Sequence, residues 1–446
     1  MPTALTAAHK SWRVKVFAST WLAYVGFYFC RKPFYAAKHS IGTEYGWDAI
    51  TLGNIWACYL IAYALGQFLA SWMGTKLGPR RNVLLGMMLS ILVTLAMGIV
   101  PSVPILMGLV TVNGLAQATG WSGNVGTMAG WFVKSERGRV MGLWSTNFTI
   151  GSLVSTLAMA WVLSQRELIT SIPWVFEIKI HEPEPWRWCF YLGAIVLAIL
   201  ALQFFLLQRN RPEDVGLAPL DDPSTPTDES TTHEPIGPMP GGLSRTAWTN
   251  LLLVGGFYFF AKFVRYAVWS WSAYFLQENY KLSAAEANTY SIVFDLLGIP
   301  GVYFTGWISD RYLNSRRAGI SLVMMLGMTV ATGMLMMFAD SGVTVFVALL
   351  GAVGFTLYGP DALLTGAGAM DIGGRRSATF AAAAISGIGS LGPIVQEVII
   401  PRLYDQKAAQ ASGELGPVFA LLFGSAALAS VFCAVLVIRN RGGKGV

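Results

Sequence analysis

The sequence predicts an all-α integral membrane protein whose chain crosses the bilayer twelve times. The 446 residues are 54% hydrophobic and 12% charged, whereas a soluble domain carries about 25% charged residues. Apolar stretches of about 20 residues recur along the whole chain, and each is long enough to cross ~30 Å of hydrocarbon as a helix. A membrane β-barrel would show short alternating segments instead of these continuous runs, so the pattern favours a helical bundle.

Each predicted span is a continuous apolar stretch between polar segments. The spans are 16–37, 50–73, 82–100, 104–130, 139–163, 187–208, 247–275, 286–307, 319–338, 342–367, 376–400 and 416–438. The polar segment after the sixth span is rich in Pro, Asp, Ser and Thr, which is typical of a linker. We therefore expect an N-terminal six-helix bundle at 1–208, a cytoplasmic linker at 209–245 and a C-terminal six-helix bundle at 246–446.

Basic residues set the predicted orientation. With both termini in the cytoplasm, 20 of the 31 Lys and Arg residues fall in cytoplasmic segments, seven fall outside (Lys38 among them) and four fall within spans. This imbalance follows the positive-inside rule. The cytoplasmic segments then account for most of the net charge of +7, and no nucleic-acid partner is expected.

Cysteines and histidines indicate neither a disulfide framework nor a metal centre. All four cysteines lie in apolar stretches, where buried free thiols are usual, and the four histidines are scattered. The sequence also contains no visible pairing of a nucleophile with a base. We therefore expect no cofactor, no metal and no enzymatic activity.

Four basic side chains lie inside otherwise apolar spans. They are Arg31 and Lys32 in the first span and Lys262 and Arg265 in the seventh. A charge at the centre of a membrane helix costs about 2.5–3.5 kcal/mol on insertion scales, so such residues face a protein interior or a water-filled cavity. Two basic pairs in corresponding halves of the chain predict a pocket for a strongly anionic ligand.

The two halves of the chain also echo each other. The tetrapeptide Gly-Phe-Tyr-Phe occurs at 26–29 and again at 256–259, an offset of 230 residues. In that register Arg265 lies four residues, or about one helical turn, beyond the position of Arg31. Transporters commonly consist of such repeats and bind substrate near the bilayer midplane, where the repeats meet.

A series of short motifs runs through the chain in a fixed order. The motifs are Tyr28 to Phe34 (Tyr-Phe-Cys-Arg-Lys-Pro-Phe), Asn113 to Trp121, Trp131-Phe132 with Glu136-Arg137-Gly138, Arg265-Tyr266 with Trp271, Gly298 to Gly301 and Tyr358 to Pro360. Together they resemble the organophosphate:phosphate antiporter family of the major facilitator superfamily, which includes transporters and a sensor of phosphate esters. The resemblance covers essentially the whole chain and implies the major facilitator fold, with the two six-helix bundles related by pseudo-symmetry.

The resemblance also implies a site for a phosphate ester. Arg31 and Arg265 match the family's phosphoryl-binding pair, and Lys32 matches a companion cation. A phosphate ester carries about −1.5 to −2 charges, and guanidinium binds its oxygens in bidentate fashion. The expected substrate-binding residues are Arg31, Arg265, Lys32, Lys262, Tyr266, Tyr28, Tyr35, Gln67, Trp121 and Asp295.

Three positions depart from the family's pattern. Gln67 stands where many members carry lysine, and Phe148 or Thr149 stands where some carry histidine, so the substrate is not transferred from any one member. Thr75 replaces the acid of the first loop motif, whereas Asp310 keeps that acid in the second half. Gating contacts are expected from Asp310, Arg311, Arg316 and Arg81.

Asp295 and Asp361 are the acidic residues that we place within spans. Together with the four cations they leave an excess of two positive charges, which a phosphate dianion would neutralise. In an alternative interpretation, these carboxylates form structural ion pairs with Arg31 and Arg265. For the two lysines, snorkelling or neutralising a carboxylate is as good an interpretation as binding substrate.

We expect an antiporter that exchanges a phosphate ester, either a sugar phosphate or glycerol 3-phosphate, for inorganic phosphate by alternating access. One alternative is a membrane sensor that binds hexose phosphate and signals to a membrane kinase without transport. The second is a proton-coupled transporter of another small solute, which would need a central titrating carboxylate and not two arginines. The lipid bilayer is the expected surrounding, and we expect a monomer in a bacterial inner membrane.

Overall fold

The structure is a computed structural model that describes residues 6–99, 102–132, 140–141, 143–165, 185–219, 244–312, 317–408 and 416–441. Every regular element in these ranges is a helix. The chain divides into two compact units, one formed by Met1–Trp47 with Ile55–Thr232 and the other by Asp48–Asn54 with His233–Val446. Each unit is described by itself.

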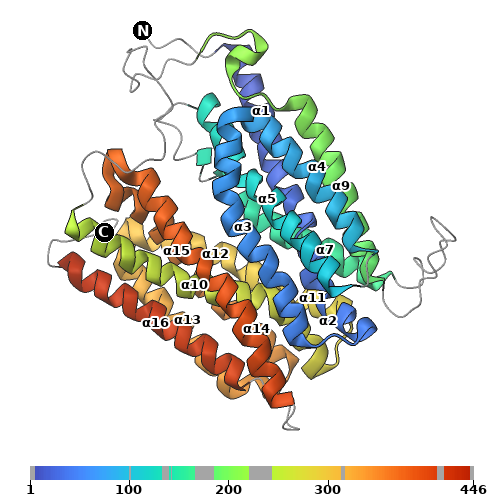
Figure 1. Cartoon of the computed structure of the whole chain (residues 1–446). Coiled ribbons are helices and arrows are strands. Elements are labelled where there is room, and N and C mark those ends of the chain that lie inside the picture. The colour runs from blue at the N-terminus through green and yellow to red at the C-terminus, as the bar shows by residue number, and fades with distance from the viewer. Residues whose placement is uncertain are drawn as a thin grey trace. The chain divides into compact units, whose positions relative to one another are not determined.

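The first unit is built from seven described α-helices and one short 3₁₀ turn. They are α1 (Ala7–Phe29), α2 (Lys32–Tyr45), α3 (Ala49–Leu77, which begins in the second unit), α4 (Pro79–Met97), α5 (Val103–Trp131), α7 (Thr146–Ser164), α9 (Trp186–Leu207) and η1 (Pro212–Val215). α1 packs against α5, α7 and α9, and α4 packs against α5 and α9 (Figure 1). Large aromatic side chains fill the core of this unit, among them Trp131 and Trp144.

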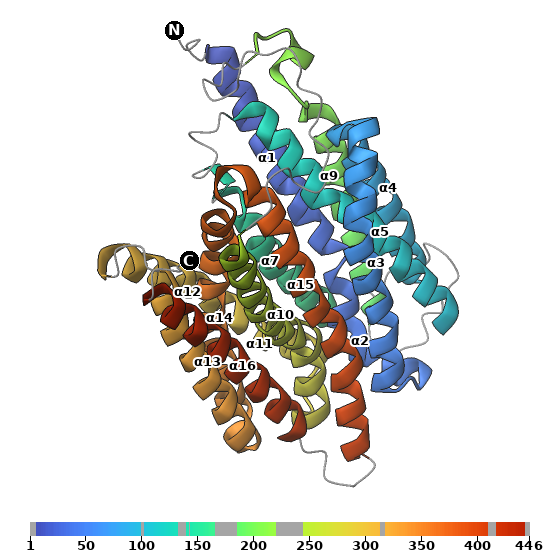
Figure 2. The ribbon, with the colours of Figure 1, turned by 60° about the vertical axis from the view of Figure 1, so that its left-hand side comes forward.

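The second unit contains the remaining helices. They are α10 (Arg245–Tyr280), α11 (Ala284–Ser291), α12 (Val293–Tyr312), α13 (Arg317–Phe338), η2 (Ala339–Ser341), α14 (Val343–Ala362), the π-helical turn η3 (Leu363–Gly368), α15 (Ala369–Ala408) and α16 (Gly416–Arg441). α10 packs against α15 and α16, while α12 packs against α14. α13 and α16 lie side by side (Figures 1 and 2).

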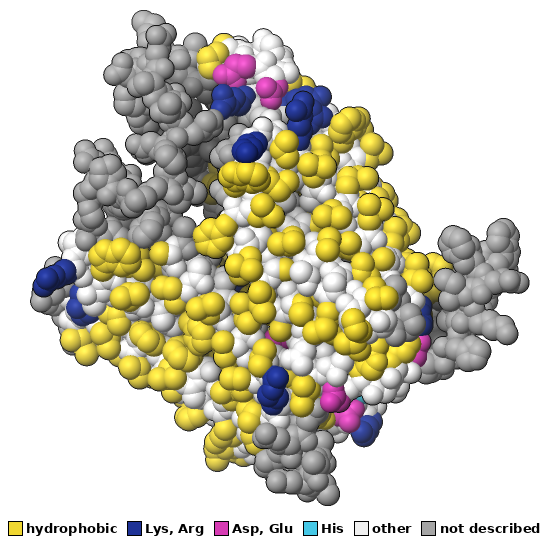
Figure 3. Space-filling model, in the orientation of Figure 1, with side chains coloured by type: hydrophobic (Ala, Val, Ile, Leu, Met, Phe, Trp, Pro, Cys, Tyr) yellow, Lys and Arg dark blue, Asp and Glu magenta, His cyan; other side chains and the backbone are white. Residues whose placement is uncertain are grey.

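The helices have the length and surface of membrane spans. Eleven helical stretches of the described chain are long and apolar enough to cross a bilayer. In the space-filling view, hydrophobic side chains cover most of the described part of one face and charged side chains are sparse (Figure 3). The first predicted span, 16–37, is not among the eleven, because the chain there is divided between α1 and α2 and includes Arg31 and Lys32. The prediction of an all-α, multi-pass membrane protein is confirmed.

The predicted linker is folded at its beginning, and its residues 220–243 lie outside the described part of the chain. Asp214 Oδ2 accepts the amide hydrogens of Asn210 at 2.8 Å and Arg211 at 3.2 Å, which fixes the turn η1. The carbonyl oxygen of Ala218 lies 3.0 Å from Nε2 of His9 in α1. The chain that leaves α9 therefore packs onto the end of its own unit.

Candidate functional site

Arg31 lies at a break between two helices. α1 ends at Phe29 and α2 begins at Lys32, with Pro33 in its first turn. Proline has no amide hydrogen, so the carbonyl of Phe29, four residues earlier, loses its helical partner. α9 approaches this carbonyl so closely that a Cβ at Gly193 would lie 2.0 Å from the Phe29 oxygen, which requires glycine there. Pro33 and Gly193 together explain the break.

Neutral groups surround the Arg31 guanidinium, which is only 3% exposed. Its Nε donates a hydrogen bond to Gln117 Oε1 at 3.0 Å. The rings of Tyr28, Tyr63 and Tyr59 lie 4.8, 5.0 and 5.7 Å from the guanidinium carbon, within the range of cation–π attraction. Among the described residues, no carboxylate forms an ion pair with Arg31. The charge of Arg31 is therefore stabilised without being neutralised.

A hydrogen-bond network holds both Arg31 and the helix break. Gln117 Oε1 also accepts from the Tyr59 hydroxyl at 2.8 Å, and Gln117 Nε2 donates to Asn113 Oδ1 at 3.1 Å. Asn113 Nδ2 in turn donates to the carbonyl oxygen of Cys30 at 3.1 Å. Ser90 donates to Asn113 Oδ1 at 2.7 Å, so α4 joins the network. The amide of Asn113 thus satisfies a backbone carbonyl that the break removes from the helix.

Two further predicted residues of α2 are buried beside this network. Lys32 Nζ lies 5.5 Å from the ring centre of Tyr35. The Tyr35 ring meets Trp56 edge-on at 4.8 Å, and Phe34 stacks on the same tryptophan at 4.8 Å. Trp56 also stacks on Tyr59, one of the rings around Arg31, at 4.3 Å. An unbroken aromatic stack therefore connects Lys32 with Arg31.

Gln67 and Trp121 lie on the same helix faces as residues of this network, on α3 and α5 respectively. Gln67 is half-buried on α3, two helical turns after Tyr59 and one after Tyr63, and positions four residues apart share a helix face. Trp121 lies one turn after Gln117 on α5 and packs edge-on against Tyr24 at 5.4 Å.

Lys38 is a buried cation that the sequence analysis placed outside the membrane. α2 continues to Tyr45, and the Lys38 side chain is 0% exposed. Beyond it, Glu44 Oε1 accepts from Arg187 Nη2 of α9 at 2.6 Å and Glu44 Oε2 accepts from Trp186 Nε1 at 2.5 Å. Lys38 therefore lies in a helix that continues past residue 37, the predicted end of the first span. The signal that was missed is Pro33, which allows a new helix to start at this point.

The second basic group lies in the middle of the unbroken helix α10. Arg265 Nη1 forms a buried ion pair with Asp361 Oδ2 of α14, and the two side chains are 7% and 8% exposed. The rings of Trp269 and Tyr266 lie 5.4 and 5.6 Å from the guanidinium carbon. Arg265 Nε is buried and has no hydrogen-bond partner in the described chain. Arg265 thus forms an ion pair of the kind that the alternative interpretation expects. Arg31 forms no ion pair with a carboxylate among the described residues.

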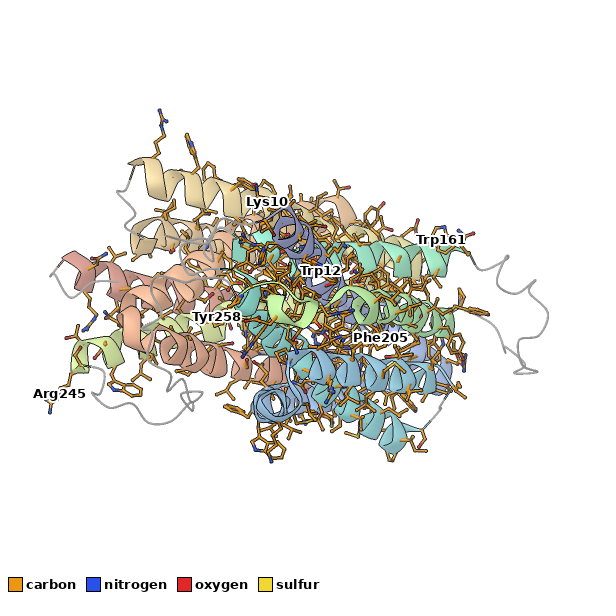
Figure 4. The ribbon with its side chains drawn as sticks, turned by 90° about the horizontal axis from the view of Figure 1, so that it is seen from above. Lys10, Trp12, Trp161, Phe205, Arg245 and Tyr258 are labelled. Carbon is orange, nitrogen blue, oxygen red and sulfur yellow. The ribbon has the colours of Figure 1, made fainter. Side chains whose placement is uncertain are left out.

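Lys262 lies one turn before Arg265 on the same helix. Its Nζ is 3.4 Å from Ser390 Oγ of α15 and 4.4 Å from the ring centre of Tyr258. Figure 4 shows Arg245 at the start of α10 and Tyr258 further along this helix. The tyrosine lies one turn before Lys262, so that its ring covers the buried ammonium group.

Asp295 of α12 belongs to the surroundings of Arg265. Its Oδ1 accepts hydrogen bonds from Trp269 Nε1 at 2.8 Å and from the Tyr358 hydroxyl. Trp269 thereby presents its ring to Arg265 and its N–H to Asp295. Arg265 and Asp295, both predicted site residues, therefore lie in one cluster within the second unit.

Glu397 is a buried carboxylate that the sequence analysis overlooked inside the span 376–400. It is 0% exposed, and its two oxygens accept hydrogen bonds from Ser270 Oγ at 2.8 Å and Gln396 Nε2 at 2.7 Å. Besides Arg13 near the start of α1, and with Lys38 and Glu397 added, five cations and three carboxylates are buried among the described residues, which again leaves an excess of two positive charges. The net excess is the same as in the prediction, but the set of buried charged residues is larger.

The predicted gating residues lie at helix ends. Arg81 in the first turn of α4 and Arg311 in the last turn of α12 are both exposed. Arg316 and the side chains of Asp310 and Thr75 lie outside the described part of the chain. The gating contacts therefore stay a prediction.

Solved structures with the same fold are transporters. A bacterial homolog of the human lysosomal transporter Spinster, in an inward-facing and unoccupied conformation, superposes with a TM-score of 0.71 at 17% identity over 95% of both chains. The xylose transporter XylE from E. coli superposes with a TM-score of 0.68 at 12% identity, over 96% of this chain and 98% of that one. At these identities the likeness shows the fold alone.

The profile of the Major Facilitator Superfamily matches residues 17–397, and the chain belongs to this superfamily. A glycerol-3-phosphate transporter of Bacillus subtilis (strain 168) is 29% identical over 396 residues, which cover 87% of this chain and 85% of that protein. A probable hexose phosphate transport protein of Chlamydia pneumoniae is 26% identical, over 83% and 80% of the two chains. The glucose-6-phosphate exchanger SLC37A2 of Mus musculus is 29% identical, over 78% and 74%. These relatives match the organophosphate:phosphate antiporter family, and the predicted resemblance is confirmed.

Proposed function

We propose that the protein is a secondary transporter that exchanges a phosphate ester, either a sugar phosphate or glycerol 3-phosphate, for inorganic phosphate. The observation that carries this proposal is Arg31, a buried guanidinium held by an amide and three tyrosine rings and paired with no described carboxylate. A buried charge that is stabilised but not neutralised is suited to an anionic ligand. The names of the relatives support a phosphate ester as that ligand.

Arg31 and Arg265 are the proposed phosphoryl-binding groups. Gln117 occupies Nε of Arg31, so both terminal nitrogens stay available for phosphate oxygens. Arg265 uses Nη1 for Asp361 and keeps its Nε for a ligand. Lys32, one residue after Arg31, and Lys262, about one turn before Arg265, add positive charge.

The remaining proposed contacts suit the carbon part of an ester. Aromatic rings bind apolar faces of a sugar, and amide, hydroxyl and carboxylate groups bind its hydroxyls. The residues proposed for this role are Tyr28, Tyr35, Tyr266, Trp121, Gln67 and Asp295.

The proposed mechanism is alternating access, in which each bundle moves nearly as a rigid body around the bound ligand. The excess of positive charge disfavours reorientation of the empty protein, and a phosphate dianion removes that excess. Reorientation then requires an anion in each direction, which gives exchange. The proposed arrangement has bundles at 1–208 and 246–446, a cytoplasmic linker at 209–245 and both termini in the cytoplasm of a bacterium. Asp310, Arg311, Arg316 and Arg81 are proposed to close the gate.

The test is uptake of labelled inorganic phosphate by proteoliposomes that contain the purified protein. Vesicles loaded with phosphate or a phosphate ester should take up label much faster than empty vesicles. Arg31→Ala and Arg265→Ala should abolish this exchange, whereas Arg245→Ala, an exposed arginine at the start of α10, should leave it intact. Equal uptake by loaded and empty vesicles would exclude obligatory exchange. Ligand binding without any flux would favour the sensor.

A further inference from the structure

We propose that Asp361 is a built-in counter-anion that sets the affinity for phosphate at Arg265. Its carboxylate weakens anion binding enough that a bound phosphate group is released rapidly during exchange. This inference rests on the proposed function, because it concerns the same anion site. It assigns to Asp361 a role in specificity and turnover, whereas a purely structural pair would only stabilise the fold.

The geometry of the ion pair leaves part of the Arg265 guanidinium unpaired within the described chain. Asp361 engages Arg265 through a single pair of atoms, Oδ2 and Nη1. The Nε of Arg265 is buried and has no hydrogen-bond partner in the described chain. An unsatisfied N–H on a buried guanidinium is costly unless a ligand completes it. Arg265 is therefore only partly paired within the described chain, and Nε is the donor that we expect a phosphate oxygen to complete while Asp361 stays bound.

The backbone around Asp361 is held in place. α14 packs directly on α12, where a Cβ at Gly359 would lie 2.0 Å from Thr305 Oγ1 and a Cβ at Gly354 would lie 2.0 Å from the Phe294 carbonyl oxygen. After Asp361 the helix widens into the π-helical turn η3, a form that often accompanies functional sites. Thr365 Oγ1 of this turn donates to the Asp361 carbonyl oxygen at 2.7 Å. The carboxylate therefore stays near Arg265 whether or not a ligand is bound.

A carboxylate held beside the guanidinium that binds an anion lowers the affinity for that anion. Phosphate attracted to Arg265 is repelled by Asp361 at short range in a medium of low dielectric constant. The other two buried carboxylates are covered by neutral donors, Asp295 by Trp269 and Tyr358 and Glu397 by Ser270 and Gln396. Asp361, by contrast, pairs directly with a side chain that is proposed to bind phosphate.

The test compares the full-length protein with two neutral variants, Asp361→Asn and Asp361→Gln. Inorganic phosphate is used as the probe because it has no carbon part for a carboxylate to bind. Calorimetry should give a Kd for phosphate at least about tenfold lower than that of the wild type, since one nearby negative charge is removed. In proteoliposomes, KM should fall and the maximal exchange rate should fall with it, because release becomes slower.

Two control variants separate this role from a structural one. Asp361→Glu keeps the charge and should keep the Kd within about threefold of wild type. Asp340→Asn removes an exposed negative charge from the same unit and should change neither Kd nor rate. Purification in phosphate protects the neutral variants, because a ligand stabilises the folded state it binds.

The outcomes of this experiment are distinct. Folded neutral variants that bind phosphate with unchanged or weaker affinity would overturn the role of Asp361, and so would neutral variants that stay unfolded even in saturating phosphate. In both cases wild-type binding and exchange would leave the proposed function standing. If the wild type binds neither phosphate nor any phosphate ester, the proposed function fails and this inference fails with it.

Discussion

Arg31 and Arg265 occupy nearly equivalent places in the two bundles, but their surroundings differ in charge. An amide and three tyrosine rings surround Arg31, whereas a carboxylate pairs with Arg265. Besides Arg13 near its start, the described part of the first unit buries three cations and no carboxylate, whereas that of the second buries two cations and three carboxylates. The two halves thus place an arginine on corresponding helices but surround it with different buried charges. Under the proposed function, we therefore expect the first bundle to attract anions more strongly and the second to tune their binding.

The backbones of the two regions differ as well. α1 breaks before Arg31, whereas α10 runs through Arg265 as one helix of 36 residues. In the register of the repeat, Phe263 stands where the first half has Pro33. A residue with an amide hydrogen continues the helical ladder, and proline does not. This difference, together with the close packing of Gly193 and the hydrogen bond from Asn113, explains why one arginine lies at a joint and the other within a continuous helix.

The largest expected effect tests which arginine dominates. Arg31→Ala should lower kcat/KM for phosphate exchange by about 10³-fold, since two charge-assisted hydrogen bonds at about 1.5–3 kcal/mol each are lost. Its melting temperature should change little, because no described carboxylate is left unpaired. Exchange kinetics and thermal unfolding measure both quantities. A greater loss of phosphate affinity in Arg265→Ala would reverse the comparison.

Arg265→Ala should abolish exchange and, unlike Arg31→Ala, should also lower stability. It leaves Asp361 buried without its partner, which costs about 3 kcal/mol, and the melting temperature should fall clearly. The double variant Arg265→Ala with Asp361→Asn should recover most of that loss without recovering exchange. Fluorescence-monitored unfolding checks the recovery. A double variant no more stable than the single one would show that the ion pair is unimportant for the fold.

Gln117→Glu should make the first bundle resemble the second. The new carboxylate would lie on Arg31 as Asp361 lies on Arg265, so the Kd for phosphate should rise about tenfold. The measurement is phosphate binding by calorimetry. Gln165→Glu adds the same charge at the end of α7 and serves as the control. Unchanged affinity in Gln117→Glu would mean that phosphate does not reach Arg31.

The smallest effect is expected for Pro33→Ala. Asn113 and the close packing of Gly193 hold the break from outside the helix, so restoring an amide hydrogen should change stability by no more than about 1 kcal/mol. Exchange should stay within about threefold of wild type. Gly193→Ala should destabilise the protein far more, because its Cβ would meet the Phe29 carbonyl. Thermal unfolding of both variants decides whether proline or packing maintains the break.

The sequence alone was sufficient for the fold, because the length of an apolar stretch and the spacing of polar loops are local properties. It also indicated the basic residues within the spans, since a charge in an apolar run is visible without coordinates. It was not sufficient for the partners of these charges. The burial of Lys38 was not predicted, because a residue count does not reveal that a helix restarts after Pro33. Glu397 was visible within the span 376–400 and was overlooked, whereas its partners and the pairing of Asp361 with Arg265 depend on how α10, α14 and α15 pack.

The attachment of α2 has a mechanical consequence. At one end of α2, Pro33 lies against Gly193, and at the other end Glu44 accepts hydrogen bonds from Arg187 and Trp186; all three of these contact points belong to α9. The same glycine packs against the carbonyl of Phe29, the last residue of α1, so α9 braces both sides of the break at Cys30 and Arg31. The side chain proposed to bind the cargo therefore lies at a joint that a third helix splints, and we expect α1, α2 and α9 to shift together when the cargo binds.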